Sequence, residues 1–217
     1  MNAQGNRGAL REIVIPGQPP LAAILGVPDG ASGLVIFAHG SGSGRLSPRN
    51  NHVAARLREA GMATLLLDLL TPAEEQDRRN VFDIALLASR LQRAVDWAAG
   101  HAETARLRPC YFGASTGGGA ALYAAAQDRR IAAVVSRGGR PDLAGKQALA
   151  LVTAPTLLIV GELDDIVIEL NEQARQAMTC ESKLTIVPGA GHLFEEPGTL
   201  DAVVTQARNW FLDHLEG

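Results

Sequence analysis

Short aliphatic runs alternate with helix-like segments along most of this chain. The central runs VIF, TLLL, AAVV and TLLIV are continuous and are not interrupted by polar residues. Such runs are typical of strands that are covered on both faces, and therefore of a parallel sheet. The alternation predicts a three-layer α/β sandwich, with a mostly parallel central sheet of about eight strands flanked by helices.

The predicted strands cover residues 10–15, 21–27, 34–38, 63–67, 110–112, 131–136, 156–160 and 183–187. The predicted helices cover residues 48–60, 81–99, 116–127, 168–178 and 200–215. The first two strands are expected to form an antiparallel lead-in hairpin. We expect one domain over residues 1–217, with a flexible N-terminus at 1–9. Residues 138–154 are the only room for a lid and are too few for a cap domain.

Composition excludes several functional classes. Hydrophobic residues make up 47% of the chain, which is enough for a folded core. The net charge of −3 and the 4% aromatic content do not suggest a nucleic-acid partner. No apolar run has the length of a signal peptide or a membrane span, and the two cysteines, Cys110 and Cys180, form no CxxC pair. We expect a cytoplasmic protein with reduced thiols and no membrane partner, whose exposed final helix would allow a homodimer.

Residues capable of chemistry follow the predicted strands. Ligands of open α/β sheets bind beyond the carboxyl ends of the strands, so these residues are expected at one edge. They are His39, Asp68, Ser115, Arg137, Asp164, Asp165 and His192.

The stretch GASTG places Ser115 between Gly113 and Gly117, at a strand-to-helix junction. A serine on such a sharp turn has a strained backbone, and side chains two positions away would collide. The turn lifts the hydroxyl clear of the sheet and places it at a helix N-terminus, where negative charge is favoured. This is the G-x-S-x-G pattern of a nucleophile elbow in its expected context.

With these motifs in order, the chain resembles the α/β-hydrolase superfamily, in its small dienelactone-hydrolase-like branch. The resemblance covers residues 21–215 and rests on HGSGSG, GASTG, GELDDIV, GAGHLFEE and the strand order. Dienelactone hydrolases proper differ from this chain by using cysteine at the elbow. Ser115 therefore favours an ordinary ester over a dienelactone as substrate.

The resemblance implies a role for each matching residue. Ser115 would be the nucleophile, although a serine before a helix is more often only an N-cap. His192 would be the general base, and Asp164 would orient it. Asp165 is the adjacent competitor for the acid, and Glu162 is a weaker one.

The oxyanion hole needs two backbone donors. One is expected to be the amide of Thr116, directly after the nucleophile. The other is expected from the loop after His39, where the amide of Ser41 is the first choice and that of Gly42 the second. The loop GSGSG lacks the GxGxxG spacing and no GK[ST] occurs, so nucleotide binding is not indicated. His39 is expected to be structural, bonding within the loop.

Arg45 and Arg137 also lie at this edge. Each is interpreted as an ion pair or loop anchor, and alternatively as a contact to an acidic substrate. Gly42 is a further weak candidate for substrate contact. The histidines have neither i,i+4 spacing nor a cysteine partner, so no metal site is predicted, and the chemistry needs no cofactor.

These features predict a serine hydrolase that cleaves small or short-acyl carboxylic esters through an acyl-enzyme intermediate. A dienelactone or lactone hydrolase, thioesterase, amidase or acyltransferase on the same residues stays open, because fold does not fix the substrate. A catalytically silent ligand-binding homologue is the alternative from another class. The expected partner is a small-molecule ester.

Overall fold

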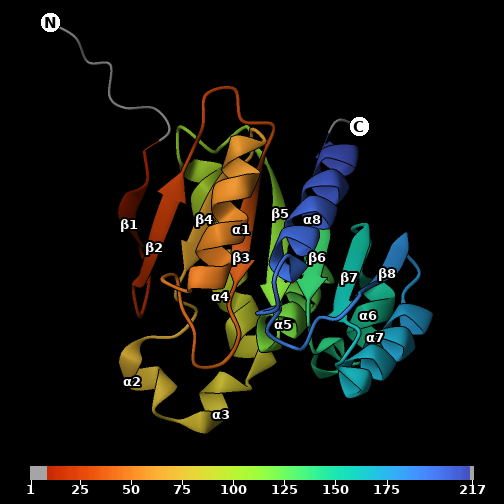
Figure 1. Ribbon diagram of the computed structural model, residues 1–217. Coiled ribbons are helices and arrows are strands. Elements are labelled where there is room, and N and C mark those ends of the chain that lie inside the picture. Colours follow the sequence, from red (N-terminus) through yellow and green to blue (C-terminus); the bar gives the residue numbers. More distant parts are fainter. Residues whose placement is uncertain (1–8, 216–217) are drawn as a thin grey trace, which may run out of the picture.

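The computed structural model describes residues 9–215 and contains one eight-stranded sheet (Figure 1). The strands are β1 (Arg11–Ile15), β2 (Leu21–Gly26), β3 (Gly33–Ala38), β4 (Ala63–Leu67), β5 (Arg108–Ala114), β6 (Val134–Arg137), β7 (Thr156–Gly161) and β8 (Ser182–Val187). Apart from Ala9, the N-terminus that was expected to be flexible lies outside the described residues. No helix within residues 9–215 is both long enough and apolar enough to cross a membrane.

Within the described residues, five longer helices and several short ones accompany the sheet. The longer helices are α1 (Pro48–Glu59), α4 (Ile84–Gly100), α5 (Thr116–Ala125), α7 (Asp165–Ala177) and α8 (Thr199–Leu215). The short ones are α2 (Pro72–Glu75), α3 (Arg78–Val81), the 3₁₀ helix η1 (Pro141–Ala144) and α6 (Lys146–Leu151).

The sheet has the order β1-β2-β4-β3-β5-β6-β7-β8. All pairs from β4 to β8 in this order are parallel, whereas β1–β2 and β2–β4 are antiparallel. The predicted mostly parallel sheet and the lead-in hairpin are therefore confirmed. Because β3 and β5 are adjacent, the loops that follow them lie side by side at the same edge, the lower one in Figure 1.

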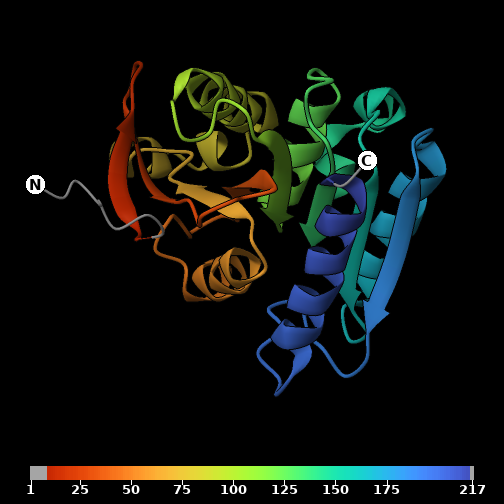
Figure 2. The ribbon, with the colours of Figure 1, turned by 90° about the horizontal axis from the view of Figure 1, so that it is seen from above.

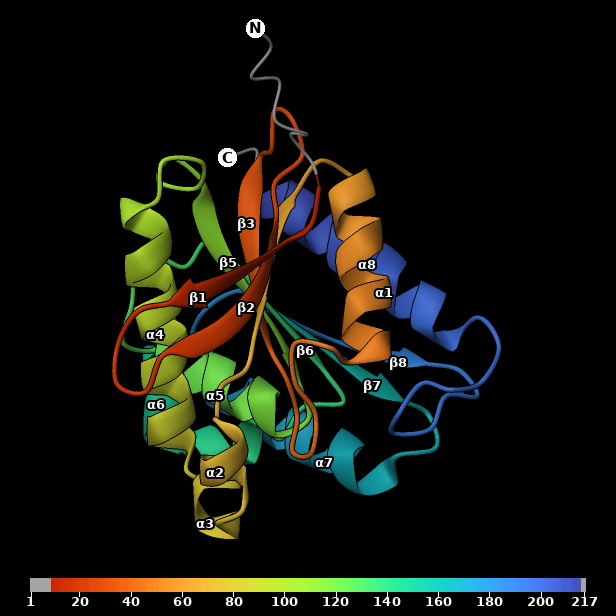
Figure 3. The same ribbon diagram turned by 90° about the vertical axis from the view of Figure 1, so that its left-hand side faces the viewer.

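Helices cover both faces of the sheet (Figures 2 and 3). Helices α1 and α8 pack on the face that carries Val35, Phe37 and Phe112. Helices α4 and α5 pack on the other face, over Ile36 and Tyr111. Successive residues of β3 thus enter opposite cores, which explains why its aliphatic run has no polar alternation.

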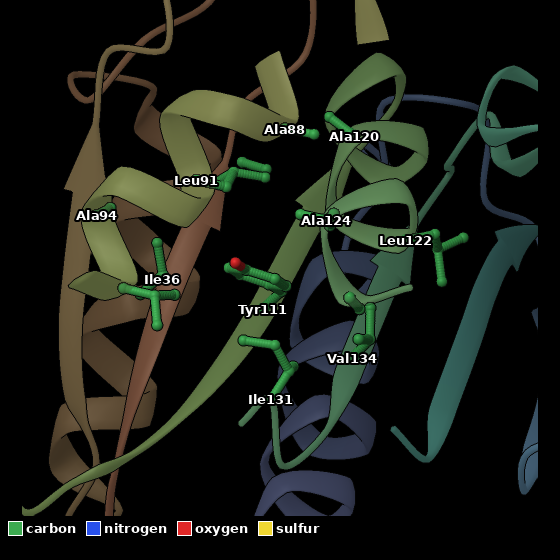
Figure 4. Close-up of a cluster of buried hydrophobic side chains, with 14 of the residues drawn as sticks. Ile36, Ala88, Leu91, Ala94, Tyr111, Ala120, Leu122, Ala124, Ile131 and Val134 are labelled. Carbon is green, nitrogen blue, oxygen red and sulfur yellow. The ribbon is translucent and has the colours of Figure 1, made fainter. Parts of the chain in front are cut away.

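Small side chains let α5 approach its neighbours closely. Ala120 and Ala124 of α5 lie in the same buried cluster as Ala88 and Leu91 of α4 (Figure 4). Tyr111 of β5 lies beneath them and is fully buried. The alanine-rich composition of α5 therefore provides close packing of the helix that carries Ser115 at its N-terminus.

The sequence analysis missed α2, α3 and α6. The stretch after Leu70 does carry a signal for α2, since Thr71 and Glu74 form a capping box and Pro72 is the first helical residue. The segment at 138–154 does not form a lid, because η1 and α6 in it pack against α5 and α7. Strand β6 begins at Val134 and α7 begins at Asp165, so both boundaries differ from the predicted ones by three residues.

We predict that Tyr111→Phe stabilises the protein by about 1 kcal/mol, because an unsatisfied buried polar group carries a desolvation cost. The Tyr111 hydroxyl is buried and has no hydrogen-bond partner among residues 9–215. Burial also raises the pKa of this phenol, so the group stays protonated. Urea unfolding of both proteins measures the difference. Tyr111→Leu, which removes the ring, should destabilise, and a loss of stability in Tyr111→Phe would contradict the prediction.

Candidate active site

Ser115 lies on a sharp turn between β5 and α5. Its backbone has φ 50° and ψ −123°, which is unusual for a residue with a side chain. The two flanking glycines make this turn sterically allowed. A Cβ at Gly117 would lie 2.2 Å from the carbonyl oxygen of Ala38, and a Cβ at Gly113 would lie 2.6 Å from that of Gly117. The GASTG pattern is therefore required by close backbone packing at this junction.

The hydroxyl of Ser115 does not cap the helix that it precedes. No hydrogen bond joins its side chain to an amide of α5 in the described chain. Its backbone is held instead, since its amide donates to the carbonyl oxygen of Arg137 at 3.2 Å and its carbonyl accepts from Arg140 at 3.0 Å. The local geometry thus fixes the residue and leaves the hydroxyl for other interactions.

His192 and Asp164 are brought together from separate loops. Nδ1 of His192 lies 2.6 Å from Oδ2 of Asp164, and the carboxylate is more buried than the imidazole. Asp164 directly precedes α7, while Asp165 is the first residue of that helix. Glu162 accepts instead from the amide of Gly189 at 2.8 Å. Among the three acidic candidates, Asp164 is the one bonded to the histidine, so Nε2 is left for another group.

Ser115 follows β5 and His192 follows β8, two strands whose ends lie at the same edge of the sheet. Ser115 is bonded through its amide to Arg137, the last residue of β6. The next residue, Gly138, lies against the histidine, because a Cβ there would be 3.6 Å from Cε1 of His192. Ser115 and the bonded pair of His192 and Asp164 therefore lie at the same edge of the sheet, with Arg137 and Gly138 between them.

The residues whose amides are expected to bind an oxyanion lie around one small cavity. Ser41, Gly42 and Thr116 border it, and its volume is about 10 Å³. A Cβ at Gly40 would lie 3.1 Å from Cβ of Ser115, which places the glycine loop (residues 40–44) directly beside the elbow. Within residues 9–215, the hydrogen bonds between backbone groups do not use the amides of Ser41, Gly42 or Thr116. Their use as donors to a bound oxygen stays a prediction.

His39 is structural. Its Nδ1 lies 2.9 Å from the carbonyl of Gly40, which is the expected bond within the loop. Its Nε2 accepts from the amide of Leu69 at 2.9 Å, a contact to the loop after β4 that the sequence did not reveal. Burial lowers the pKa of His39, so the imidazole is neutral with its proton on Nδ1.

The two predicted arginines have different surroundings. Arg45 forms an ion pair with Asp68, whose Oδ1 also accepts from the Arg45 amide at 2.6 Å. This pair anchors the glycine loop to the end of β4, in agreement with the interpretation of Arg45 as an ion pair or loop anchor. Arg137 is buried, and its contacts are with Asn50 and Phe194 rather than with a carboxylate. Contact of Arg45, Arg137 or Gly42 with substrate stays a prediction.

The segment after β4 contributes residues that the sequence analysis did not assign to the site. Leu70, Glu75 and Val81 line the small cavity beside the glycine loop. A larger open cleft of about 530 Å³ continues from it and includes Arg45 and Arg49. The apolar residues of this segment were visible in the sequence, but only the folded chain shows which strand end they cover.

The described residues do not suggest a metal centre. No group of three or more His, Cys, Asp or Glu side chains in them is arranged to bind a metal ion. Cys110 lies within β5, where burial raises the pKa of its thiol to about 12 and leaves it unreactive.

A comparison with protein families decides the affiliation. Residues 31–211 match the family described as alpha/beta hydrolase domain. The chain belongs to the α/β-hydrolase family. Within this family it falls in the dienelactone-hydrolase-like branch. It is 52% identical to the crystal structure of a dienelactone hydrolase from Anabaena variabilis, with a TM-score of 0.92 over 96% of this chain and 99% of that one.

Two further relatives widen the picture of this α/β hydrolase. Est1E from Butyrivibrio proteoclasticus shares its fold, with a TM-score of 0.80, 18% identity and coverage of 95% of this chain and 99% of that one. A Mycobacterium tuberculosis protein with the provisional name phosphoribosyl transferase is 58% identical over 94% of this chain, but the match is only 46% of that protein. The α/β hydrolase thus spans about half the length of this curated relative.

We predict that protonation of His39 destabilises the protein in mild acid. Its pKa is lower in the folded state than its ordinary value of about 6.5, so the unfolded chain binds the extra proton first and stability falls as the pH drops below 6.5. His39→Gln, whose amide oxygen can still accept from Leu69, should show a shallower fall, by up to about 1.4 kcal/mol per pH unit. Urea unfolding of both proteins between pH 7 and 5 measures the two slopes. Equal slopes would contradict the prediction.

Proposed function

We propose that this α/β hydrolase cleaves carboxylic esters, with Ser115, His192 and Asp164 as its catalytic triad. The observation that carries the proposal is the bond between His192 and Asp164, at the same sheet edge as a serine whose hydroxyl caps no helix amide. In a catalytic triad, a carboxylate bonded to Nδ1 fixes the tautomer of the imidazole, leaves Nε2 for the serine and stabilises an imidazolium. Membership of a family with esterase and dienelactone-hydrolase structures supports it.

The proposed reaction has two halves. Oγ of Ser115 attacks the ester carbonyl while Nε2 of His192 takes its proton. The amides of Ser41 and Thr116 donate to the oxyanion that forms. His192 then returns the proton to the departing alkoxide, leaving an acyl-enzyme on Ser115. A water molecule, deprotonated by His192, hydrolyses this ester and restores the serine.

The small cavity favours a short acyl group. It borders the proposed oxyanion donors, and its volume of about 10 Å³ is close to that of one water-sized group. Leu70, Val81 and Leu87 give it an apolar wall. The leaving alcohol would occupy the open 530 Å³ cleft, where a wide range of alcohols can be accommodated. We therefore propose acetyl-sized or similar acyl groups.

A lactone is the second candidate substrate. It is favoured by the relative named dienelactone hydrolase, which is 52% identical to this chain. The same residues would open a cyclic ester, with the alcohol remaining attached to the acyl group. The name phosphoribosyl transferase is not extended to this chain, since more than half of the protein that carries it lies outside the match. A small-molecule partner, a cytoplasmic location and a homodimer remain part of the proposal.

The acyl-enzyme route predicts a burst of p-nitrophenol, or continuous turnover, when wild type meets p-nitrophenyl acetate. Ser115→Ala removes the nucleophile and should reduce the rate by at least about 10³-fold. Asp164→Asn should also slow turnover strongly, whereas Asp165→Asn, one residue away, should not. Stopped-flow absorbance of the four proteins measures the effect.

Near-background release from wild type and Ser115→Ala alike, with esters, thioesters and lactones, would overturn the esterase proposal. Saturable binding of an ester without turnover would then indicate a silent ligand-binding homologue. Equal losses in Asp164→Asn and Asp165→Asn would contradict the assignment of the acid.

Val81 is predicted to limit the acyl chain. Val81→Ala enlarges the cavity and should raise the ratio of kcat/KM for butyrate over acetate about 10-fold, while Val81→Leu should lower it. Leu151→Ala is the matched control, because this leucine is exposed on α6 and does not line the cavity. An unchanged ratio in both Val81 variants would show that acyl groups bind elsewhere.

A further inference from the structure

His192 lies on a loop between β8 and α8, and this loop needs an anchor. The imidazole is partly exposed and its side-chain bond is the one to Asp164. Neither a helix nor a strand fixes the backbone of His192. The orientation of Nε2 therefore depends on what holds the neighbouring loop residues.

Phe194, two residues after the histidine, is that anchor. Its side chain is buried, with 2% exposed, in the cluster under α1 and α8. Its φ of 55° lies in the left-handed region, which is unfavourable for a residue with a side chain. A conformation of this kind persists only where the surrounding structure holds it.

The side chain of Arg137 contacts the ring of Phe194. Its guanidinium carbon lies 5.9 Å from the centre of the Phe194 ring, within the range of a cation–π contact. Its Nη2 also lies 3.4 Å from Oδ1 of Asn50, in the first turn of α1. The side chain thus joins the histidine loop to the helix that follows the glycine loop.

The backbone of the same residue joins the nucleophile. The carbonyl oxygen of Arg137 accepts from the amide of Ser115 at 3.2 Å. The next residue, Gly138, has φ 50°, and a Cβ there would lie 3.5 Å from the Phe194 ring and 3.6 Å from the His192 ring. Arg137 is therefore bonded to the proposed nucleophile through its backbone, and its side chain contacts the phenylalanine two residues after the proposed base.

The surroundings of Arg137 do not suggest a stabilising ion pair. The residue is 8% exposed, and its Nη1 is buried without an acceptor among the described residues. Burial, together with the nearby charge of Arg49, lowers the pKa of Arg137 to about 10. A buried charge with incomplete hydrogen bonding is costly, and an apolar residue of similar volume is often as stable or more stable.

We propose that Arg137 is a positioning residue that holds His192 in register with Ser115 through the ring of Phe194. The inference rests on the proposed function, because it assigns His192 the role of base. It explains why a charged residue stands where an apolar one would pack: the planar guanidinium spans the distance from the aromatic ring to Asn50. Methionine can fill the space but cannot make both contacts.

The test is a double-mutant cycle on Arg137→Met and Phe194→Leu. Each single change should lower kcat for p-nitrophenyl acetate about 10-fold with KM within twofold of wild type. The double variant should be no slower than the slower single variant, because both changes break one contact. The melting temperature of Arg137→Met should equal or exceed that of wild type. Arg56→Met, an exposed arginine of α1, is the matched control and should change neither quantity.

Three results would overturn the proposal. The first is a lower melting temperature of Arg137→Met with full kcat per folded molecule, which would indicate a purely structural residue. The second is a rise in KM confined to an anionic ester such as mono-p-nitrophenyl succinate, which would indicate substrate contact. The third is multiplicative loss of kcat in the double variant.

A readout that needs no ester turnover separates this proposal from the esterase proposal. The rate at which a fluorophosphonate labels Ser115 also depends on the base, and it should fall about 10-fold in Arg137→Met. The downfield proton signal of the His192–Asp164 bond, identified by its loss in His192→Gln, should broaden in the same variant. If wild type is labelled but does not turn over esters, only the esterase proposal fails. An unchanged labelling rate and signal in Arg137→Met would overturn the positioning role.

Discussion

The approach of Gly117 to the end of β3 is the contact on which the site depends. Here the start of α5 meets the carbonyl oxygens of Ala38 and His39 with no side chain between them. The contact sets the angle at which α5 leaves β5, and with it the strained backbone of Ser115. It also brings the glycine loop beside the elbow. One backbone contact therefore places both the hydroxyl of Ser115 and the amides that we propose as oxyanion donors.

Bonds between the loops extend this arrangement along the edge. His39 ties the end of β3 to the loop after β4, and the pair of Arg45 with Asp68 ties the glycine loop to the same place. Arg137 does the same between β6 and the histidine loop. The site is thus built from loops, and each of these loops is held in place by a contact with a neighbouring loop or strand end.

Much of this could be predicted from the sequence because it depends on local patterns. The aliphatic runs identify the strands, and the glycines around Ser115 report a steric requirement at two fixed positions. The bond of Asp164 rather than Asp165 to His192 follows a family motif. The contact of Arg137 with Phe194 could not be predicted, because it joins residues far apart in the chain. The cavity wall formed by Leu70 and Val81 was also missed. The two short helices after Leu70, α2 and α3, have too little apolar periodicity to be recognised in the sequence.

Those two short helices are attached differently from the rest of the fold. Neither α2 nor α3 contains a buried residue, and their ends are held by capping side chains such as Thr71 and Asp77. The segment nevertheless supplies part of the wall of the cavity beside the glycine loop. Substitutions there alter the shape of that wall while leaving the sheet, the elbow and the histidine loop intact. Related chains can therefore evolve to bind different ligands through changes in this segment, while the proposed catalytic residues stay the same.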